Sequence, residues 1–132
     1  MKKKIGIIGG GAAGLMAAYA AAMEGASVTI FEKNNRPARK VMITGKGRCN
    51  VTNNCDRDTF LSNVAHGSRF MYSAFCAFSC EDTINFFENK GVPLKTERGN
   101  RVFPVSDKAV DIVDALSSVT KLNNVSIINS RV

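Results

Sequence analysis

Apolar residues near the start of the chain form two short runs separated by a longer alanine-rich stretch. The first run, KIGII at residues 4–8, is compact and apolar, which is typical of a short buried strand. Residues 15–24 are rich in alanine and favour a helix that ends at Gly25. Residues 27–31 predict a second strand. Strand, helix and strand in this order predict a β-α-β unit, in which the two strands run parallel.

Helical spacing dominates the middle of the chain. Apolar side chains recur at this spacing in residues 60–64 and again in residues 70–78. Ser79 is then expected to be the N-cap of another helix, because Asp82 follows three residues later and can complete a capping box. Gly91 is expected to stop that helix.

The last third of the chain returns to the β-α-β pattern. Residues 102–103, after the Gly99-Asn100 turn, favour a strand that could form a hairpin. Ser106 is expected to cap a helix with apolar positions from 109 to 119, and residues 125–128 predict a final strand. The fold class is therefore α/β with a parallel sheet. Doubly wound sheets usually carry five or six strands, so residues 1–132 are expected to be one part of a larger domain.

A glycine motif lies between the first strand and the first helix. Gly9, Gly11 and Gly14 have the spacing G-x-G-x-x-G, and Glu32 stands at the end of the next strand. The glycines permit a tight turn, a close approach of a pyrophosphate to the backbone, and close packing of helix on strand. The helix N-terminus attracts the pyrophosphate, and Glu32 can accept hydrogen bonds from ribose hydroxyls. Because Glu32 disfavours a 2′-phosphate, FAD or NAD is favoured over NADP. The alternative is a glycine-rich turn that binds nothing.

A second unusual loop, TGKGRCNVTN at residues 44–53, follows the second strand. It lies beyond the carboxyl edge of the predicted sheet, where doubly wound folds bind their ligands. Gly45 lets backbone N–H groups approach a ligand closely. Short side chains that can donate to and accept from a flavin ring edge are Asn50, Thr52 and Asn53. Cations that can neutralise a diphosphate or an anionic substrate are Arg39, Lys40 and Arg48. The alternative is a solvated basic loop.

The net charge is +7, from 18 basic and 11 acidic residues, and the excess is uneven. Residues 33–48 contain six lysines and arginines and no acid. Such a cluster can be a solvated face, a phosphate site or a nucleic-acid surface. Because it coincides with the region where cofactor phosphates are expected, we predict a small-molecule site and no nucleic-acid partner.

The four cysteines and the single histidine do not form a metal-binding pattern. Cys76 and Cys80 are expected on one helix face, but no second ligand pair accompanies them, so no metal site is predicted. Cys49 and Cys55 suggest a catalytic disulfide, yet their spacing of C-x5-C differs from the C-x4-C of flavin disulfide reductases. His66 has no visible catalytic partner and is interpreted as a surface residue.

The N-terminus raises the alternative of a signal peptide, because three lysines precede an uncharged stretch. Glycines at positions 9–11 interrupt this stretch, which also makes it a poor membrane span. The sequence is therefore interpreted as that of a cytoplasmic protein with reduced thiols and no membrane contact.

Three segments together resemble a known family. GIIGGGAAGLMAA, FEKNNRPARKVMITGKGRCNVTN and ERGNRVFPVSDKAVDIVDAL are similar to segments of the NAD(P)/FAD-dependent oxidoreductases that include aminoacetone oxidase-like proteins and 3-dehydro-bile acid Δ4,6-reductases. The resemblance runs along essentially the whole chain. One departure is Ala38, where the family often has glycine. Members are close to three times this length, which implies that an inserted substrate domain and a C-terminal return are absent from these 132 residues.

The resemblance also implies a set of FAD contacts. The diphosphate would lie on Gly9, Gly11, Ala13 and Gly14, and the adenosine on Glu32 and Lys33. The path toward the ring would be lined by Arg39, Lys40, Gly45, Arg48, Asn50, Thr52 and Asn53. The backbone of Val132 would touch the adenine.

The sequence thus predicts the N-terminal part of the Rossmann-like FAD-binding domain of a flavoprotein oxidoreductase. NAD(P)H is expected as the electron donor and an organic small molecule as the acceptor. No side chain is identified as a catalytic acid or base, since the cofactor carries the chemistry. The alternatives are a disulfide reductase using Cys49 and Cys55, a nucleic-acid-binding flavoprotein that modifies tRNA, and a fragment that is inactive by itself.

Overall fold

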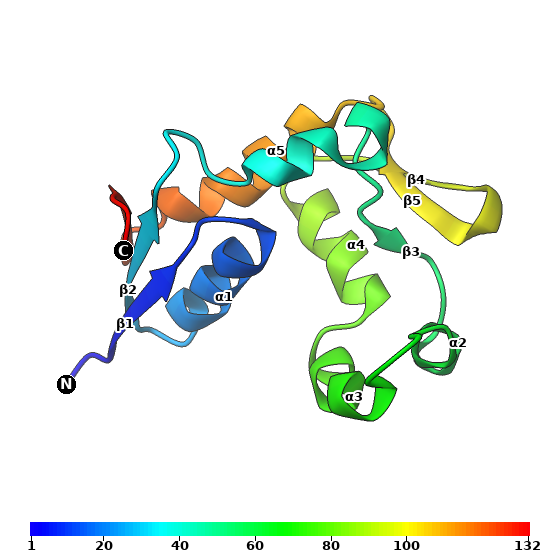
Figure 1. Ribbon diagram of the computed structural model, residues 1–132, viewed down its shortest axis with the longest axis horizontal. Helices are drawn as coiled ribbons and strands as arrows, with labels where there is room; N and C mark the ends of the chain where they lie inside the picture. The colour runs from blue at the N-terminus through cyan, green and yellow to red at the C-terminus, as the bar shows by residue number, and fades with distance from the viewer.

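The computed structural model describes residues 1–132 and contains two sheets (Figure 1). The first is parallel, as predicted from the β-α-β pattern, and its strand order is β1-β2-β6. Its strands are β1 (Lys4–Ile8), β2 (Ser27–Glu32) and β6 (Val125–Asn129). The helical segments associated with it are α1 (Ala12–Met23), α5 (Ala109–Ser117) and the 3-10 turn η3 (Ser118–Lys121).

One face of the central strand forms the core with these helices. Val28 and Ile30 of β2 are almost completely buried and belong to the same apolar cluster as Leu15 of α1 and Ile112 of α5. The alternate residues of β2, among them Thr29, are only half-buried. The period of two along the strand therefore places one row of side chains against the helices. This packing fixes α1 so that its N-terminus stands at the carboxyl edge of the sheet.

The second sheet is antiparallel, with the order β3-β5-β4. Figure 1 shows it on the far side of the molecule from both termini, with α5 reaching between the two sheets. Its strands are β3 (Thr52–Asn53), β4 (Leu94–Glu97) and β5 (Arg101–Pro104), with the turn η2 (Arg98–Asn100). The other segments are η1 (Arg39–Gly47), α2 (Arg57–Ser62), α3 (Ser68–Ala77) and α4 (Cys80–Asn89).

The predicted helix signals at α4 and at the end of α1 are confirmed. Ser79 and Asp82 form a complete capping box at the start of α4. Gly25 and Gly91 follow the ends of α1 and α4 with φ of +81° and +82°. Glycine reaches this left-handed region without the Cβ penalty of other residues, so the sequence specifies where both helices stop.

Two local predictions were wrong. Ser106 does not cap α5, whose N-cap is Lys108 without a side-chain bond; its hydroxyl instead accepts from the Lys108 N–H at 3.2 Å. The reason is that Asp107 has φ +58°, which turns the chain between Ser106 and the helix. Cys76 and Cys80 do not share a helix face either, because α3 ends at Ala77 and the backbone is extended before α4 begins.

None of the helices is long and apolar enough to cross a bilayer. Nor do three or more histidine, cysteine, aspartate or glutamate side chains gather anywhere as they would around a metal ion.

Candidate functional site

The glycine turn between β1 and α1 is the most constrained part of the site. Gly9 has φ +94°, and its N–H donates to the Phe31 carbonyl of β2 at 2.8 Å. A Cβ built on Gly14 would lie only 1.9 Å from the carbonyl oxygen of Gly9. A Cβ on Gly11, by contrast, would meet nothing within 4 Å. Gly14 therefore lets the helix approach the turn, whereas Gly11 leaves open space in front of the helix N-terminus.

Glu32 connects this turn to the end of β2. Only 6% of Glu32 is exposed, and its carboxylate accepts from the Gly10 N–H at 2.7 Å. It also accepts from the backbone and side-chain N–H groups of Asn34, at 2.7 and 2.8 Å. These hydrogen bonds, that from the Asn34 backbone first, lower the pKa of Glu32 although burial opposes them. The carboxylate is therefore ionised at neutral pH and holds the two edges of the site together.

We expect the Glu32→Gln variant to be less stable than wild type at pH 7, by roughly 1–3 kcal/mol, because an N–H would be left facing an amide nitrogen. The lowered pKa also sets a pH dependence. The stabilisation by the carboxylate is fully present above its ordinary pKa of 4.5 and is lost as the pH falls through the lower pKa of the folded state. Urea unfolding from pH 7 to pH 3 measures both effects.

The Glu32→Gln variant should show a weaker loss of stability below pH 4.5 than wild type. Asp58→Asn provides a control, because Asp58 is an exposed acid whose partner is its neighbour Arg57. Equal acid dependence in wild type and Glu32→Gln would contradict a stabilising role for the ionised Glu32.

The carboxyl edge of the parallel sheet opens into a cleft of about 830 Å³. It brings together the glycine turn, the end of β2, the start of η1 and the end of the chain. Eight of the residues predicted from the sequence line it, namely Gly9, Gly11, Ala13, Glu32, Lys33, Arg39, Lys40 and Val132. The three basic side chains among them form no ion pair with an acidic side chain. The cleft therefore combines a helix N-terminus with uncompensated positive charge.

Ala38 explains how Arg39 and Lys40 reach this cleft. Its N–H donates to the Gly10 carbonyl at 2.7 Å, so the chain turns back onto the glycine turn. Ala38 is buried and has φ +55°, a left-handed conformation that glycine adopts more easily. The glycine that the family resemblance leads us to expect at this position would therefore adopt the observed backbone conformation more easily than Ala38 does.

Residues 44–53 leave the cleft through a tight left-handed turn. Gly45 and Lys46 have φ of +54° and +56°, and Cys49 has φ +61°. A Cβ on Gly45 would lie 2.8 Å from the Asn50 backbone nitrogen, so Gly45 packs directly on the returning chain. Glycine is therefore required here for packing as well as for its backbone conformation.

An apolar pocket of about 310 Å³ adjoins the cleft. Ala12, Val41 and Thr44 line both. Cys49 and Asn50 also line the pocket, with aromatic residues of α4. Burial raises the pKa of the Cys49 thiol, although a hydrogen bond with the Thr44 hydroxyl opposes this rise, so the thiol is protonated at neutral pH. The pocket is suited to a flat, mostly apolar group with few polar atoms.

The remaining predicted residues do not line the cleft. Gly14 packs behind the glycine turn, and Gly45 packs on Asn50. Thr52 and Asn53 form β3, and the Asn53 amide donates to the Gly99 carbonyl at 2.9 Å. Asn50, with its amide nitrogen turned toward β5, donates to the Val102 carbonyl at 3.2 Å.

Arg48 also faces away from the cleft. Its guanidinium pairs with Glu97 and Asp107 and lies 4.1 Å from the centre of the Phe103 ring. The roles predicted for Arg48, Thr52 and Asn53 at a cofactor stay predictions.

The cysteines that could form a catalytic pair line different pockets. Cys49 lies in the apolar pocket, whereas Cys55 lies with Asn53 in a separate one. The pKa of Cys55 is raised by burial and then by the neighbouring thiol of Cys80. Cys80, which begins α4, is thus the thiol that neighbours Cys55, and all four cysteines are free.

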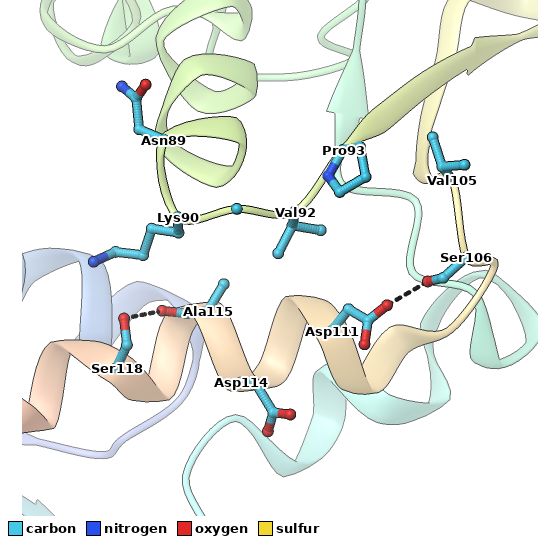
Figure 2. A pocket seen from close by; sticks show the side chains of 11 residues that line it. Asn89, Lys90, Val92, Pro93, Val105, Ser106, Asp111, Asp114, Ala115 and Ser118 are labelled. Atoms are coloured by element: carbon cyan, nitrogen blue, oxygen red, sulfur yellow. Dashed lines mark hydrogen bonds between the residues drawn. The ribbon is translucent and has the colours of Figure 1, made fainter.

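A further cleft of about 750 Å³ lies between α5 and the connection from α4 to β4. None of the residues predicted for the cofactor lines it. Figure 2 shows Asp111 turned toward Ser106, to which it is hydrogen-bonded, and Asp114 pointing to the other side of α5. Lys90 lies over the rings of Tyr19 and Phe86. Asp111 and Lys90 are thus engaged within the protein, and the charged groups of this cleft do not converge on one point.

Sequence reasoning missed several residues of the site. Asn34 and Gly10 hold the Glu32 carboxylate, and Ser130 and Arg131 line the cleft beside Val132. The position of Asn34, two residues after the acid, was a usable signal because asparagine often bonds to nearby groups in turns. Nothing in the sequence distinguished Arg131 from an ordinary surface arginine.

Comparison with known proteins shows which family the chain resembles. Residues 3–132 match the model of the HI0933-like protein Rossmann domain. The chain is 35% identical over 128 residues to the 3-dehydro-bile acid delta(4,6)-reductase of Clostridium scindens. This alignment covers 94% of the chain and 30% of that protein. It is 32% identical over 121 residues to the ribosomal RNA dihydrouridine synthase of Escherichia coli, covering 91% of this chain and 29% of that protein.

A second ribosomal RNA dihydrouridine synthase is similar to the chain as well. The ribosomal RNA dihydrouridine synthase of Haemophilus influenzae is 34% identical over 113 residues, or 85% of this chain and 27% of that protein. The chain thus spans less than a third of the length of each of these relatives.

A solved structure supports the fold. The crystal structure of THI4 from Thermovibrio ammonificans aligns with a TM-score of 0.61 and 16% identity, over 96% of this chain and 38% of that one. At this identity the likeness concerns the fold alone. Because the family model covers the chain from residue 3 to its last residue, the chain belongs to the family of the HI0933-like protein Rossmann domain.

Proposed function

We propose that this chain is the N-terminal part of the FAD-binding domain of a flavoprotein that reduces an organic small molecule with electrons from NAD(P)H. The observation that carries the proposal is the cleft at the carboxyl edge of the sheet. It joins an open glycine turn, an ionised acid and unpaired cations within one space. A dinucleotide needs these three features for its diphosphate and ribose.

The diphosphate would lie in front of α1. Gly11 leaves room there, and the free N–H groups of the first helical turn point toward that space. Arg39 and Lys40, which line the same cleft, supply positive charge. Together these groups would orient the diphosphate without any movement of the backbone.

The adenosine would lie toward the end of β2. Glu32 already accepts three hydrogen bonds, and a carboxylate can accept about four, so it can take one more from a ribose hydroxyl. Lys33 and Val132 flank the same part of the cleft. We assign the adenine to the surface beside the Val132 backbone.

The isoalloxazine ring would extend the other way, into the apolar pocket. The pocket shares Ala12 and Thr44 with the cleft, whereas the residues assigned to the adenosine line the cleft alone. Its volume and mostly apolar lining fit a flat tricyclic ring, and the backbone of residues 44–50 can supply polar contacts to one ring edge. Bound FAD would supply hydride transfer. The residues of this chain would orient the ring and exclude water from it.

An FAD titration tests this proposal. The protein is expected to quench flavin fluorescence with a single saturable curve, and ADP is expected to compete because it carries the adenosine and diphosphate. AMP should compete more weakly, since it lacks the bridging phosphate. An unchanged flavin signal over the whole titration, with no retention of FAD on gel filtration, would reject the proposal.

We also propose that the protein is located in the cytosol, because its four cysteines are all free thiols.

A second candidate function is reduction of a base in RNA, which the sequence alone does not favour. Two relatives, at 32% and 34% identity, are named ribosomal RNA dihydrouridine synthase, and they are the reason to consider this function. Basic residues 33–46 could contact phosphates next to the cleft. RNA binding that weakens steeply with salt, and that survives saturation of the protein with FAD, would support it. Binding that FAD abolishes would instead place the polyanion in the cofactor cleft.

A further inference from the structure

Arg48 stands at the centre of a charged network that connects three segments of the chain. Its Nε donates to Asp107 at 2.8 Å, and its terminal nitrogen contacts both Asp107, at 2.7 Å, and Glu97. Lys95 adds a second cation, 2.8 Å from Asp107 and 3.8 Å from Glu97. The guanidinium lies over the Phe103 ring of β5. Residues 44–53 are thereby tied to the β4–β5 hairpin and to the turn that precedes α5.

The charges of this network cancel, since it contains two cations and two anions. Arg48 is therefore already compensated, unlike Arg39 and Lys40 in the cleft. Moving its guanidinium to a phosphate would leave Glu97 and Asp107 without their shared partner. The geometry thus separates Arg48 from the cations that face the cleft.

Arg48 lies within a turn, residues 45–49, whose backbone conformation needs stabilising contacts. Between Gly45 and Cys49, four residues have positive φ, and two of them, Lys46 and Cys49, are not glycine. Such conformations cost energy and persist only when surrounding contacts impose them. Two sets of side-chain contacts anchor this turn. Cys49 is buried in the apolar pocket, and Arg48 contacts Glu97, Asp107 and Phe103, which belong to distant segments of the chain.

We propose that Arg48 is a positioning residue, whose ion pairs with Asp107 and Glu97 hold the turn 45–49 in the shape that meets the flavin ring. The proposal rests on the function proposed above. It differs from direct binding of the diphosphate by Arg48, which the sequence alone favoured. The two roles predict opposite effects when the acid partner is removed.

Asp107→Asn is the most informative substitution. Asp107 has φ +58°, a conformation that asparagine tolerates well, so the variant should keep its fold. If Arg48 positions the turn, loss of the Asp107 charge loosens the turn and weakens FAD binding. If Arg48 binds phosphate, loss of the competing acid frees its charge and strengthens FAD binding. Arg48→Ala completes the pair, and Arg48→Lys tests whether a cation without the planar fork suffices.

The experiment titrates wild type and each variant with FAD and with ADP at one ionic strength and records the visible circular dichroism of bound flavin. ADP serves as a probe because it lacks the ring. We expect Arg48→Ala and Asp107→Asn each to weaken FAD binding roughly three- to tenfold, to change the flavin dichroism, and to alter ADP affinity less than about twofold. Arg48→Lys should lie between Arg48→Ala and wild type.

Arg57→Ala is the matched control, since Arg57 also pairs with an acid and lies over an aromatic ring, but on α2. It should behave as wild type. Tighter FAD binding by Asp107→Asn, equal losses of FAD and ADP affinity in Arg48→Ala, or unchanged affinity and dichroism in both variants would each overturn the positioning role. Absence of FAD and ADP binding to wild type would instead remove the proposed function, and this inference with it.

Discussion

Gly14→Ala is expected to be the most destabilising single methyl addition in this chain, with a loss of about 3 kcal/mol or more. The new Cβ would lie 1.9 Å from the Gly9 carbonyl oxygen and 3.1 Å from its carbon. Both are backbone atoms, so no flexible side chain can move aside. Relief would require α1 to shift away from β1, which would separate the fully buried Leu15 and Ala18 from the apolar cluster that includes Ile30.

Urea unfolding followed by far-ultraviolet circular dichroism measures this effect. Gly11→Ala is the matched control, because it adds the same methyl group to the same turn, where nothing lies within 4 Å. Its backbone has φ −75°, which alanine adopts freely. If Gly14→Ala unfolded at the same urea concentration as Gly11→Ala, close packing of the helix on the turn would not be the reason for this glycine.

The sequence predicted those parts of the fold that depend on local signals. The parallel strands and α1 follow from apolar runs separated by glycine, and α4 follows from a cap and a stop signal at its own ends. What it missed depends on distant partners. Thr52–Asn53 becomes a strand only because β5 lies beside it, and its short polar sequence gives no periodicity of its own. The failure of Ser106 as a cap has a local cause instead, because the left-handed Asp107 intervenes before the helix.

The residues of the candidate site likewise fall into those that a local motif predicts and those whose position depends on distant partners. The glycine turn and Glu32 were predictable, because the motif G-x-G-x-x-G specifies both their spacing and their place at the sheet edge. Arg48 was predicted to contact the cofactor because it lies close to Lys40 and Gly45 in the sequence. Its partners Glu97 and Asp107 lie 49 and 59 residues further on, and a single sequence gives no sign of that pairing. A cation can be assigned to a ligand only after its acids have been located.

Gly11→Ala is also expected to cause the largest loss of cofactor affinity without loss of fold. The space in front of Gly11 is empty of protein atoms and opens into the cleft. A methyl group there would occupy the position at which a diphosphate must approach the helix N-terminus. We expect FAD to bind roughly ten- to hundredfold more weakly, which corresponds to a steric cost of about 1–3 kcal/mol. Stability should change by less than about 1 kcal/mol, the usual effect of alanine at an N-cap.

Fluorescence titration with FAD and with ADP measures this loss, and both ligands should weaken together because both carry the diphosphate. Gly6→Ala is the matched control, since its Cβ would make an ordinary 3.6 Å contact with Phe31, and Gly6 does not line the cleft. It should bind FAD as wild type does. If Gly11→Ala also bound FAD as wild type does, the diphosphate could not lie against the start of α1. The glycine turn would then serve the packing of α1 on β1 alone, and the unpaired Arg39 and Lys40 would mark the phosphate position instead.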